Sequence, residues 1–182
     1  MADLNRMDWK ALFDALYPGF FDMPSIRALP PSGQWEEMAL DLKAFQPDDV
    51  RISVPEGITC GFYTGDRDAL RRAVGRVDDT WPELFGEDAR VYCAFDGHQV
   101  ASFCLLEHMG DYDGLRVGGP GCVGTLPEYR RRGIGLKMVQ NATAILASEG
   151  FDISFIHYTG VAGWYARLGY RTVLRWNHRG FV

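Results

Sequence analysis

The sequence lacks any long hydrophobic run. No window reaches about 18 uninterrupted apolar residues, so no membrane-spanning helix is predicted. The N-terminus reads MADLNRMDWK, which carries Asp3 and Asp8 and no long apolar stretch, and this pattern predicts no signal peptide. We therefore expect no membrane partner.

Cysteine and histidine are few and scattered. The four cysteines form no CxxC pair, their spacings match no zinc pattern and the four histidines are equally dispersed, so no metal is expected. Cys60, Cys93 and Cys104 stand in or beside apolar, strand-like runs, which indicates buried thiols. Such thiols fit a reducing cytoplasm, the expected location.

An excess of basic residues is also missing. The chain has 19 Lys and Arg against 24 Asp and Glu, a formal net charge of −5 and a pI of about 5.3. Nucleic-acid-binding domains usually carry a global or regional positive charge, so no nucleic-acid partner is expected. The one dense basic cluster is Arg130–Arg132. The net acidity is compatible with a cationic small-molecule substrate.

The chain does contain enough apolar material for a core. Its 182 residues are 47% hydrophobic and 13% aromatic. This composition excludes disorder and fits one compact domain, or one domain with an appendage.

The first 57 residues predict two helices. Residues 8–17 read as a short helix that ends at Pro18 and Gly19. After a proline-rich loop, Ser32 is a candidate N-cap for a second helix. The apolar residues of that segment share one face by helical spacing: Trp35, Met38, Ala39, Leu42 and Phe45. Residues 1–57 are therefore expected to form an N-terminal helical extension packed on the core.

From residue 58 onward, strands and helices alternate. The expected order is β-α-β-β-β-α-β-α-β, with a hairpin turn at Asp96-Gly97 and helices over 66–78 and about 133–148. Alternation with helices implies parallel strand neighbours, whereas the hairpins imply antiparallel ones. Residues 58–182 thus predict an α/β domain with a mixed, twisted β-sheet flanked by helices.

The stretch PEYRRRGIGLKMV, at 127–139, raises the question of a phosphate site. A dinucleotide fingerprint needs a third glycine, which is missing after Gly133 and Gly135. A P-loop over 119–125 would need a lysine where Thr125 stands. A third arrangement needs only a strand, a glycine-containing turn and a helix start, where free amides, the helix dipole and nearby arginines favour a pyrophosphate. An exposed basic turn beside an ordinary helix is the alternative.

Residues 123–170 resemble a known family. VGTLPEYRRRGIGLKMV is similar to the acetyl-CoA signature of the GNAT superfamily of N-acyltransferases, with the pattern Arg130-x-x-Gly133-x-Gly135. Downstream, WYARLGYRTV resembles the terminal segment of that family, with Tyr165, Gly169 and Tyr170 in its usual positions. The resemblance covers about 58–178 and implies the GNAT fold with acetyl-CoA as cosubstrate.

The resemblance also implies roles. Backbone amides from Arg131 to Gly135 would bind the pyrophosphate, the strand at Cys122–Thr125 would pair with the pantetheine arm, and an amide at Val123 would polarise the thioester carbonyl. Tyr165 would protonate the departing thiolate, or else be a packed core aromatic. The expected cofactor-binding residues are Val123, Gly124, Thr125, Arg130, Arg131, Arg132, Gly133, Ile134, Gly135 and Thr159.

One position departs from the family pattern. Many relatives carry an Asn seven residues before the tyrosine, and here Tyr158 holds that place. Thr159 is the substitute we expect to contact the pantetheine arm.

The base and the acceptor amine have weaker signals. Acyl transfer needs a deprotonated amine, and Glu107, His108 and His157 are candidates, of which Glu107 is chosen. Strand parity sends Glu107 and His108 to opposite faces, and His157 stands between apolar neighbours, as a core histidine would. For substrate binding, Asp79 and Trp81, next to Asp78, offer an acid and an aromatic for an ammonium group. A helix end and a packing Trp explain them equally well.

Three functional classes follow. The first is an N-acetyltransferase acting on a primary amine of a small molecule or peptide, by direct attack in a ternary complex. A covalent variant through Cys122 belongs to it. The second is a catalytically silent acyl-CoA sensor or regulatory module. The third is nucleic-acid binding through Arg130–Arg132, which the charge disfavours. Family analogy allows a homodimer.

Overall fold

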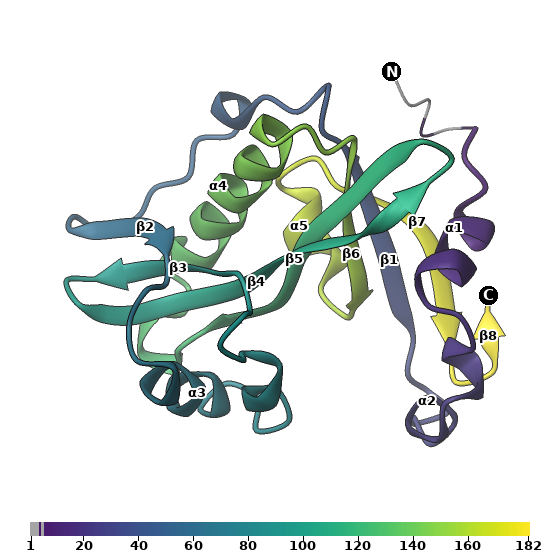
Figure 1. Cartoon of the computed structure of the whole chain (residues 1–182), viewed down its shortest axis with the longest axis horizontal. Helices are drawn as coiled ribbons and strands as arrows, with labels where there is room; N and C mark the ends of the chain where they lie inside the picture. Colours follow the sequence, from purple (N-terminus) through teal and green to yellow (C-terminus); the bar gives the residue numbers. More distant parts are fainter. Residues whose placement is uncertain (1–3, 5) are drawn as a thin grey trace. The chain divides into compact units, whose positions relative to one another are not determined.

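The computed structural model describes residue 4 and residues 6–182 (Figure 1). By internal contacts the chain divides into two compact units. Unit 1 comprises Met1–Phe45, His108–Gly119 and Leu146–Val182. Unit 2 comprises Gln46–Glu107 and Pro120–Ile145.

Helices and strands alternate along most of the described chain. The α-helices are α1 (Trp9–Leu16), α2 (Pro24–Arg27), α3 (Arg67–Gly75), α4 (Ile134–Ser148) and α5 (Ala162–Ala166). The 3-10 helices are η1 (Phe20–Asp22), η2 (Pro47–Asp49), η3 (Pro82–Leu84) and η4 (Pro127–Tyr129). The strands are β1 (Trp35–Asp41), β2 (Ile58–Phe62), β3 (Val91–Asp96), β4 (Gln99–Tyr112), β5 (Leu115–Thr125), β6 (Ile153–Thr159), β7 (Arg171–Asn177) and β8 (Gly180–Phe181). None of the helices in this described part combines the length and the apolarity that crossing a membrane requires.

The strands form one mixed sheet, which confirms the predicted α/β class. Their order is β2-β3-β4-β5-β6-β1-β7-β8. β5 and β6 are parallel, with Val117 opposite Ile153 and Gly118 opposite Ser154. The ladders of β2 with β3, of β3 with β4 and of β1 with both of its neighbours are antiparallel. The element order expected from residue 58 onward is confirmed, and β8 is an additional short strand.

The second predicted helix is wrong. Residues 35–41 form β1, which lies between β6 and β7 and pairs with both. The apolar residues of this segment recur at helical spacing, but hydrogen-bonded pairing on both edges of the strand outweighs that local pattern. Strand parity is also disturbed, since the register shifts after Glu36 against β6 and after Glu37 against β7. The predicted helix at 8–17 is confirmed as α1. The domain boundary at residue 57 stays a prediction.

Unit 1 has an aromatic-rich core. α1 begins at the N-cap Asp8, whose carboxylate accepts a hydrogen bond from the Ala11 amide. Its inner face places Leu12 against Ala39 of β1 and Phe155 of β6, all fully buried. The N-terminal segment is thus part of the core of this unit.

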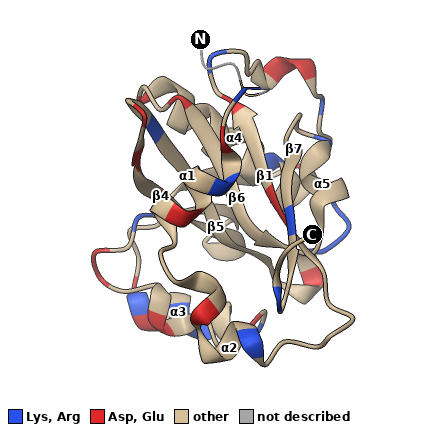
Figure 2. Cartoon of the chain, turned by 90° about the vertical axis from the view of Figure 1, so that its right-hand side faces the viewer, with Lys and Arg blue, Asp and Glu red and all other residues tan. Residues whose placement is uncertain are grey.

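Unit 2 has a separate core beneath α3. Asp66 caps this helix by accepting from the amides of Asp68 and Ala69. Leu70 and Val74 on its inner face pack with Phe85 and Phe103. The helix also carries residues of both charge signs, as Figure 2 shows.

A buried glutamine ties a loop of unit 2 to α4. Gln140 is 1% exposed, and its Nε2 donates to the carbonyl oxygens of Pro47 and Val50, each at 2.7 Å. Its Oε1 accepts from Lys137 Nζ at 2.8 Å. The side chain therefore fixes the segment at η2 against the helix that follows the basic turn.

We expect Gln140→Leu to lower the free energy of unfolding by roughly 1–3 kcal/mol, because two carbonyl oxygens lose their donor. Urea unfolding measures this. Gln34→Leu, at an exposed position, is the control and should change stability by less than about 0.5 kcal/mol. Equal effects of the two variants would contradict the tie.

Candidate functional site

The end of β5 is shaped by glycine. A Cβ at Gly124 would lie 2.3 Å from the Phe103 ring, so no larger residue fits. The Gly124 carbonyl accepts from Ser102 Oγ at 2.6 Å, and the same hydroxyl lies 2.9 Å from Thr125 Oγ1. Buried contacts on β4 thus hold the strand that leads into the basic turn.

The turn between β5 and α4 has left-handed backbone at two positions. Arg131 has φ of 60° and Gly133 has φ of 76°. A Cβ at Gly133 would lie 2.3 Å from the backbone oxygen of Ser53. Glycine is therefore required here for two reasons: its positive φ and the lack of space for a side chain. α4 begins at Ile134, and the Lys137 amide donates to the Gly133 carbonyl to close its first turn.

This geometry can hold an anion. The first amides of a helix have no partner within the helix, and the helix dipole adds partial positive charge there. Arg130, Arg131 and Arg132 are exposed beside them. Arg130 Nε donates to the Thr125 carbonyl at 3.0 Å, and the Arg132 guanidinium lies 5.8 Å from the centre of the Tyr129 ring. The predicted residues Thr125–Gly135 are therefore brought together in one strand–turn–helix.

A pocket of about 520 Å³ lies next to this turn. It is lined by Lys137 of α4 and by the loop that approaches Gly133: Pro47, Asp48, Val50, Arg51, Ile52 and Ser53. Its size suits part of a nucleotide-sized ligand.

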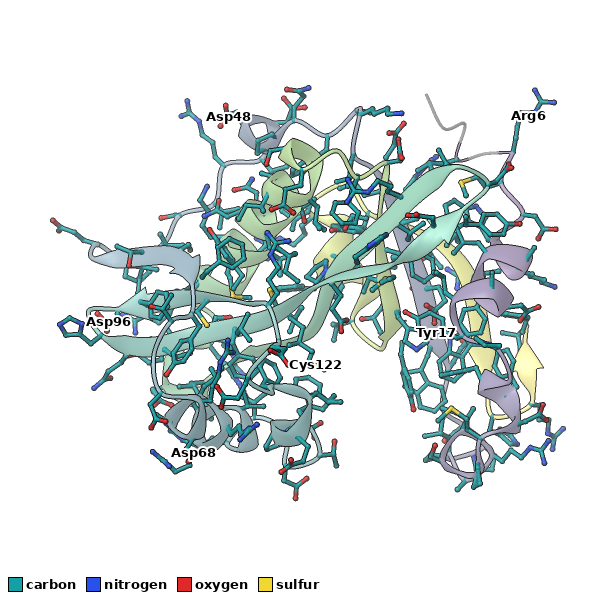
Figure 3. All side chains as sticks on the ribbon, in the orientation of Figure 1. Arg6, Tyr17, Asp48, Asp68, Asp96 and Cys122 are labelled. Carbon is teal, nitrogen blue, oxygen red and sulfur yellow. The ribbon has the colours of Figure 1, made fainter. Side chains whose placement is uncertain are left out.

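Cys122 and two acids form a second group in unit 2. Cys122, labelled in Figure 3, stands in β5 with φ of 46°, a left-handed conformation that is uncommon for a residue with a side chain. A Cβ on its neighbour Gly121 would lie 2.7 Å from Glu107 Oε2, so the Glu107 carboxylate lies against this backbone. Burial, and then the charges of Glu107 and Asp78, raise the pKa of the Cys122 thiol to about 12.

The predicted acceptor residues differ in their surroundings. Trp81 is half-buried and packs on the unit 2 core, and Asp79 is exposed. Asp78, which the sequence analysis only named beside them, accepts from the amide and the hydroxyl of Thr80 and acts electrostatically on Cys122. The spacing of these acids in the sequence did not single out Asp78.

Tyr165 lies in α5 of unit 1. It is 6% exposed and packs against the rings of Trp164 and Tyr170, with centroids 4.8 and 6.0 Å away. Thr159 is also buried, and its Oγ1 accepts from the Val161 amide at 3.0 Å. Thr159 lines a pocket of about 280 Å³ together with Gln34, Glu36, Gly160, Ala162 and Gly163.

A buried Glu–His pair in unit 1 was missed by the sequence analysis. Glu37 of β1 is fully buried, and its Oε2 lies 3.0 Å from His157 Nδ1. Glu37 lies in the segment predicted to be the second helix, so no strand-based signal pointed to it. His108, another candidate base, instead bonds the exposed carboxylate of Asp111.

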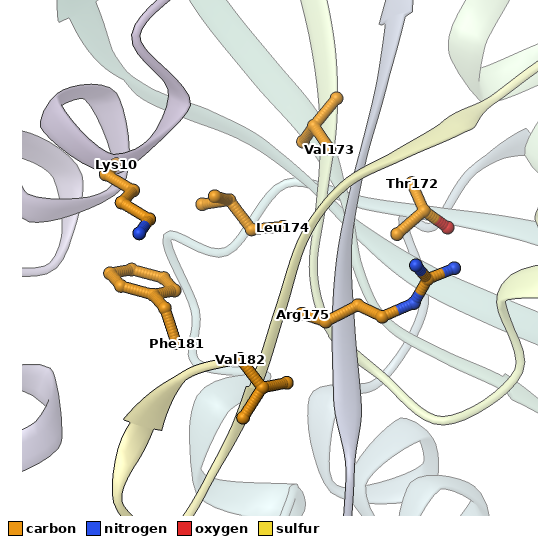
Figure 4. Close-up of a pocket in the computed structure, with 7 residues that line it drawn as sticks. All are labelled: Lys10, Thr172, Val173, Leu174, Arg175, Phe181 and Val182. Carbon is orange, nitrogen blue, oxygen red and sulfur yellow. The ribbon is translucent and has the colours of Figure 1, made fainter.

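One further pocket of unit 1 contains none of the predicted site residues. It has a volume of about 280 Å³ and is formed by α1, β7 and the C-terminus, as Figure 4 shows. Its lining residues are Lys10, Thr172, Val173, Leu174, Arg175, Phe181 and Val182. Across the described residues, no three or more His, Cys, Asp or Glu side chains gather in a way that would hold a metal ion.

We expect Gly133→Ala to destabilise the protein more than Gly57→Ala. Both positions have positive φ, at 76° and 86°, so each substitution costs roughly 1–2 kcal/mol in backbone strain. Only the Gly133 variant also meets a backbone oxygen, that of Ser53, whereas no atom lies within 4 Å at Gly57. Urea unfolding compares the two, and an equal loss would show that Ser53 does not constrain the turn.

The comparisons with known proteins bear on this region. Residues 87–172 match the family model of the acetyltransferase (GNAT) domain, a range that contains the β5–α4 turn and Tyr165. A search of curated proteins with the sequence found no match.

Solved structures share the fold. A GCN5-related glucosamine N-acetyltransferase region of a fungal multi-domain GH3 beta-N-acetylglucosaminidase has a TM-score of 0.65 and 21% identity, over 80% of this chain and 20% of that one. A GCN5-related N-acetyltransferase from Sphaerobacter thermophilus has a TM-score of 0.58 and 23% identity, over 80% of this chain and 50% of that one. A GCN5-related N-acetyltransferase from Kribbella flavida has a TM-score of 0.55 and 21% identity, over 85% of this chain and 60% of that one.

This chain thus spans less than two thirds of the length of each of these three proteins. At these identities, their likeness concerns the fold. The family match over residues 87–172 and the sheet agree with each other, and together they support membership of the GNAT superfamily.

Proposed function

We propose that this protein is an acetyl-CoA-dependent N-acetyltransferase that acts on a primary amine by direct attack in a ternary complex. The observation that carries the proposal is the β5–α4 turn. It combines left-handed backbone at Arg131 and Gly133, a helix start and three exposed arginines, inside the range that matches the GNAT domain.

The cofactor contacts follow from this turn. The amides of Arg131–Gly135 bind the pyrophosphate of acetyl-CoA, and the guanidinium groups of Arg130–Arg132 add positive charge. Arg130 keeps further N–H donors beside the one directed to Thr125. The β5 segment Val123–Thr125 pairs with the pantetheine arm. The Val123 amide donates to the thioester oxygen, where negative charge develops during attack.

Tyr165 and Thr159 complete the cofactor chemistry in this proposal. Tyr165 protonates the thiolate as CoA departs, which is reasonable because the ordinary pKa values of a phenol and a thiol differ by only about 1.5 units. The Thr159 oxygen already accepts from Val161, but its hydroxyl hydrogen can still be donated to the pantetheine arm.

The acceptor is proposed to be bound as an ammonium ion. Glu107 takes its first proton, and Asp79 and Trp81 help to hold it, with Asp78 adding negative charge in unit 2. Glucosamine is the first amine to test, because one protein of similar fold is described as a glucosamine N-acetyltransferase region. Lysine, spermidine, kanamycin and a peptide with a free N-terminus extend the panel.

The surroundings of Cys122 favour direct attack over a covalent intermediate. A thiol with a pKa of about 12 is almost entirely protonated near neutral pH, and the thiolate is the nucleophile. Cys122 therefore lacks the activation that an acyl-enzyme would need.

Acetyl-CoA alone should leave Cys122 unmodified at pH 7.5. Mass spectrometry of the intact and the digested protein checks this, with the chemically acetylated, denatured protein as the positive control. An acetyl group that maps to Cys122 and disappears when amine is added would establish the covalent route instead.

Tyr165→Phe should lower kcat by about 100-fold while the affinity for acetyl-CoA stays unchanged, because the variant loses only the proton donor. Thiol release with the amine panel is the measurement. Tyr170→Phe is the matched control. It removes a buried hydroxyl that bonds Ser154 Oγ at 2.7 Å and should reduce stability by about 1 kcal/mol without a comparable loss of turnover.

Two other outcomes decide between the classes. Unchanged turnover in Tyr165→Phe would remove Tyr165 as the acid. Binding of acetyl-CoA without turnover of any amine by the wild type would favour the acyl-CoA sensor. A cytoplasmic location and a homodimer remain part of the proposal.

A further inference from the structure

A buried carboxylate is the most unusual group of unit 1. Glu37 is fully buried, and its Oε1 accepts hydrogen bonds from Trp176 Nε1 at 2.7 Å and from the Tyr158 amide at 3.1 Å. Its Oε2 lies 3.0 Å from His157 Nδ1. The indole and the amide can only donate.

The hydrogen bond to Glu37 fixes the tautomer of His157. With Nδ1–H donated to the carboxylate, the neutral ring carries its lone pair on Nε2. Among the described residues, Nδ1 makes the one hydrogen bond of this ring. The side chain is 21% exposed. Nε2 is not one of the buried side-chain atoms without a hydrogen-bond partner. Nε2 is therefore placed to accept a proton at the surface of unit 1.

A β-bulge aims the ring at Glu37. Two residue steps on β1, from Glu36 to Met38, face three on β6, from Thr159 to Ile156. The additional residue lies at His157–Tyr158, where Tyr158 has φ of 58°. The bulge releases the Tyr158 amide from the ladder, and Glu37 accepts it.

Aromatic rings from the N-terminal segment surround the imidazole. Tyr17, labelled in Figure 3, stacks on it with centroids 3.9 Å apart, and Phe20 meets it edge-on at 5.1 Å. The titratable groups that face the ring are Glu37 from β1, Tyr17 from the end of α1 and Tyr158 on β6 itself. Burial raises the pKa of Tyr158, which stays neutral. Glu37 is thus the polar partner that orients the ring of His157.

The proposed reaction leaves one proton without an acceptor. An amine that arrives as ammonium loses two protons on its way to a neutral amide. Glu107 takes the first, before attack. Tyr165 supplies the proton that the thiolate needs, so the second amine proton still requires a base.

We propose that His157, positioned by Glu37, is the general base that takes this second proton through Nε2; this inference rests on the proposed function. The new C–N bond forms, the nitrogen gives its proton to Nε2, and the C–S bond breaks as Tyr165 protonates the sulfur. Proton exchange with water restores Tyr165, His157 and Glu107. Each turnover releases one net proton.

Kinetics test the proposal with the amine of the panel that gives the fastest thiol release. His157→Gln should lower kcat by about 100-fold, with the KM for acetyl-CoA unchanged. Activity of the wild type should fall at acidic pH, because a protonated ring cannot accept the proton of the amine. This acidic limb should vanish in His157→Gln. His98→Gln, in the exposed turn between β3 and β4, is the control.

Glu37→Gln tests the positioning role. An amide at this position can donate to Nδ1 and so favour the tautomer whose proton is on Nε2, which cannot act as a base. We therefore expect kcat to fall in any variant that folds, with the KM for acetyl-CoA unchanged, whereas a purely structural Glu37 would alter stability and leave kcat unchanged.

A second measurement is independent of turnover. ¹⁵N NMR of histidine-labelled protein at alkaline pH should show a protonated Nδ1 and an unprotonated Nε2, with His157→Gln identifying the signals. A proton on Nε2 would overturn the proposal, and so would turnover of His157→Gln within about threefold of the wild type. A wild type that binds acetyl-CoA but acetylates no amine would overturn the proposed function, and the base role with it. An active wild type beside an active His157→Gln removes the base role alone.

Discussion

The buried carboxyl group of Glu37 is the constraint on which the arrangement of unit 1 depends. A buried polar group is tolerated only where it is hydrogen-bonded, and leaving one without a partner costs roughly 1–3 kcal/mol. Here the donors come from both neighbouring strands, Trp176 on β7 and His157 with Tyr158 on β6. The bulge in β6, the burial of the Trp176 indole and the direction of the imidazole are therefore consequences of one interaction.

In unit 2 the main constraint is the close approach of the backbone to its neighbours at two glycines. Gly124 lies against the Phe103 ring and Gly133 against the Ser53 carbonyl, so the chain runs closely past its neighbours on both sides of the basic turn. Gln140 holds the loop that reaches Gly133. A turn fixed in this way presents its amides without reorganisation when an anion arrives, which is what a preorganised cofactor site requires.

The sequence predicted the β5–α4 turn because its signal is local: glycines, arginines and a helix start in one short segment. It did not predict β1, since the helical spacing of Trp35, Met38 and Ala39 is overridden by pairing with two strands distant in sequence. The Glu37–His157 pair was missed because Glu37 lies in the segment predicted to be helical. A bulge also breaks the two-residue period from which the direction of a strand side chain is inferred. His157 was seen as a buried histidine, but its partner is 120 residues away.

The central claim is that the β5–α4 turn binds the pyrophosphate of acetyl-CoA. Calorimetric titration of the wild type with acetyl-CoA, beside an Arg132→Ala, Gly135→Asp double variant whose folding is verified by circular dichroism, tests it most directly. The account predicts micromolar-range binding by the wild type, about 8 kcal/mol of binding free energy, and its loss in the variant. Absence of binding by the wild type, or equal binding by both proteins, would contradict the claim.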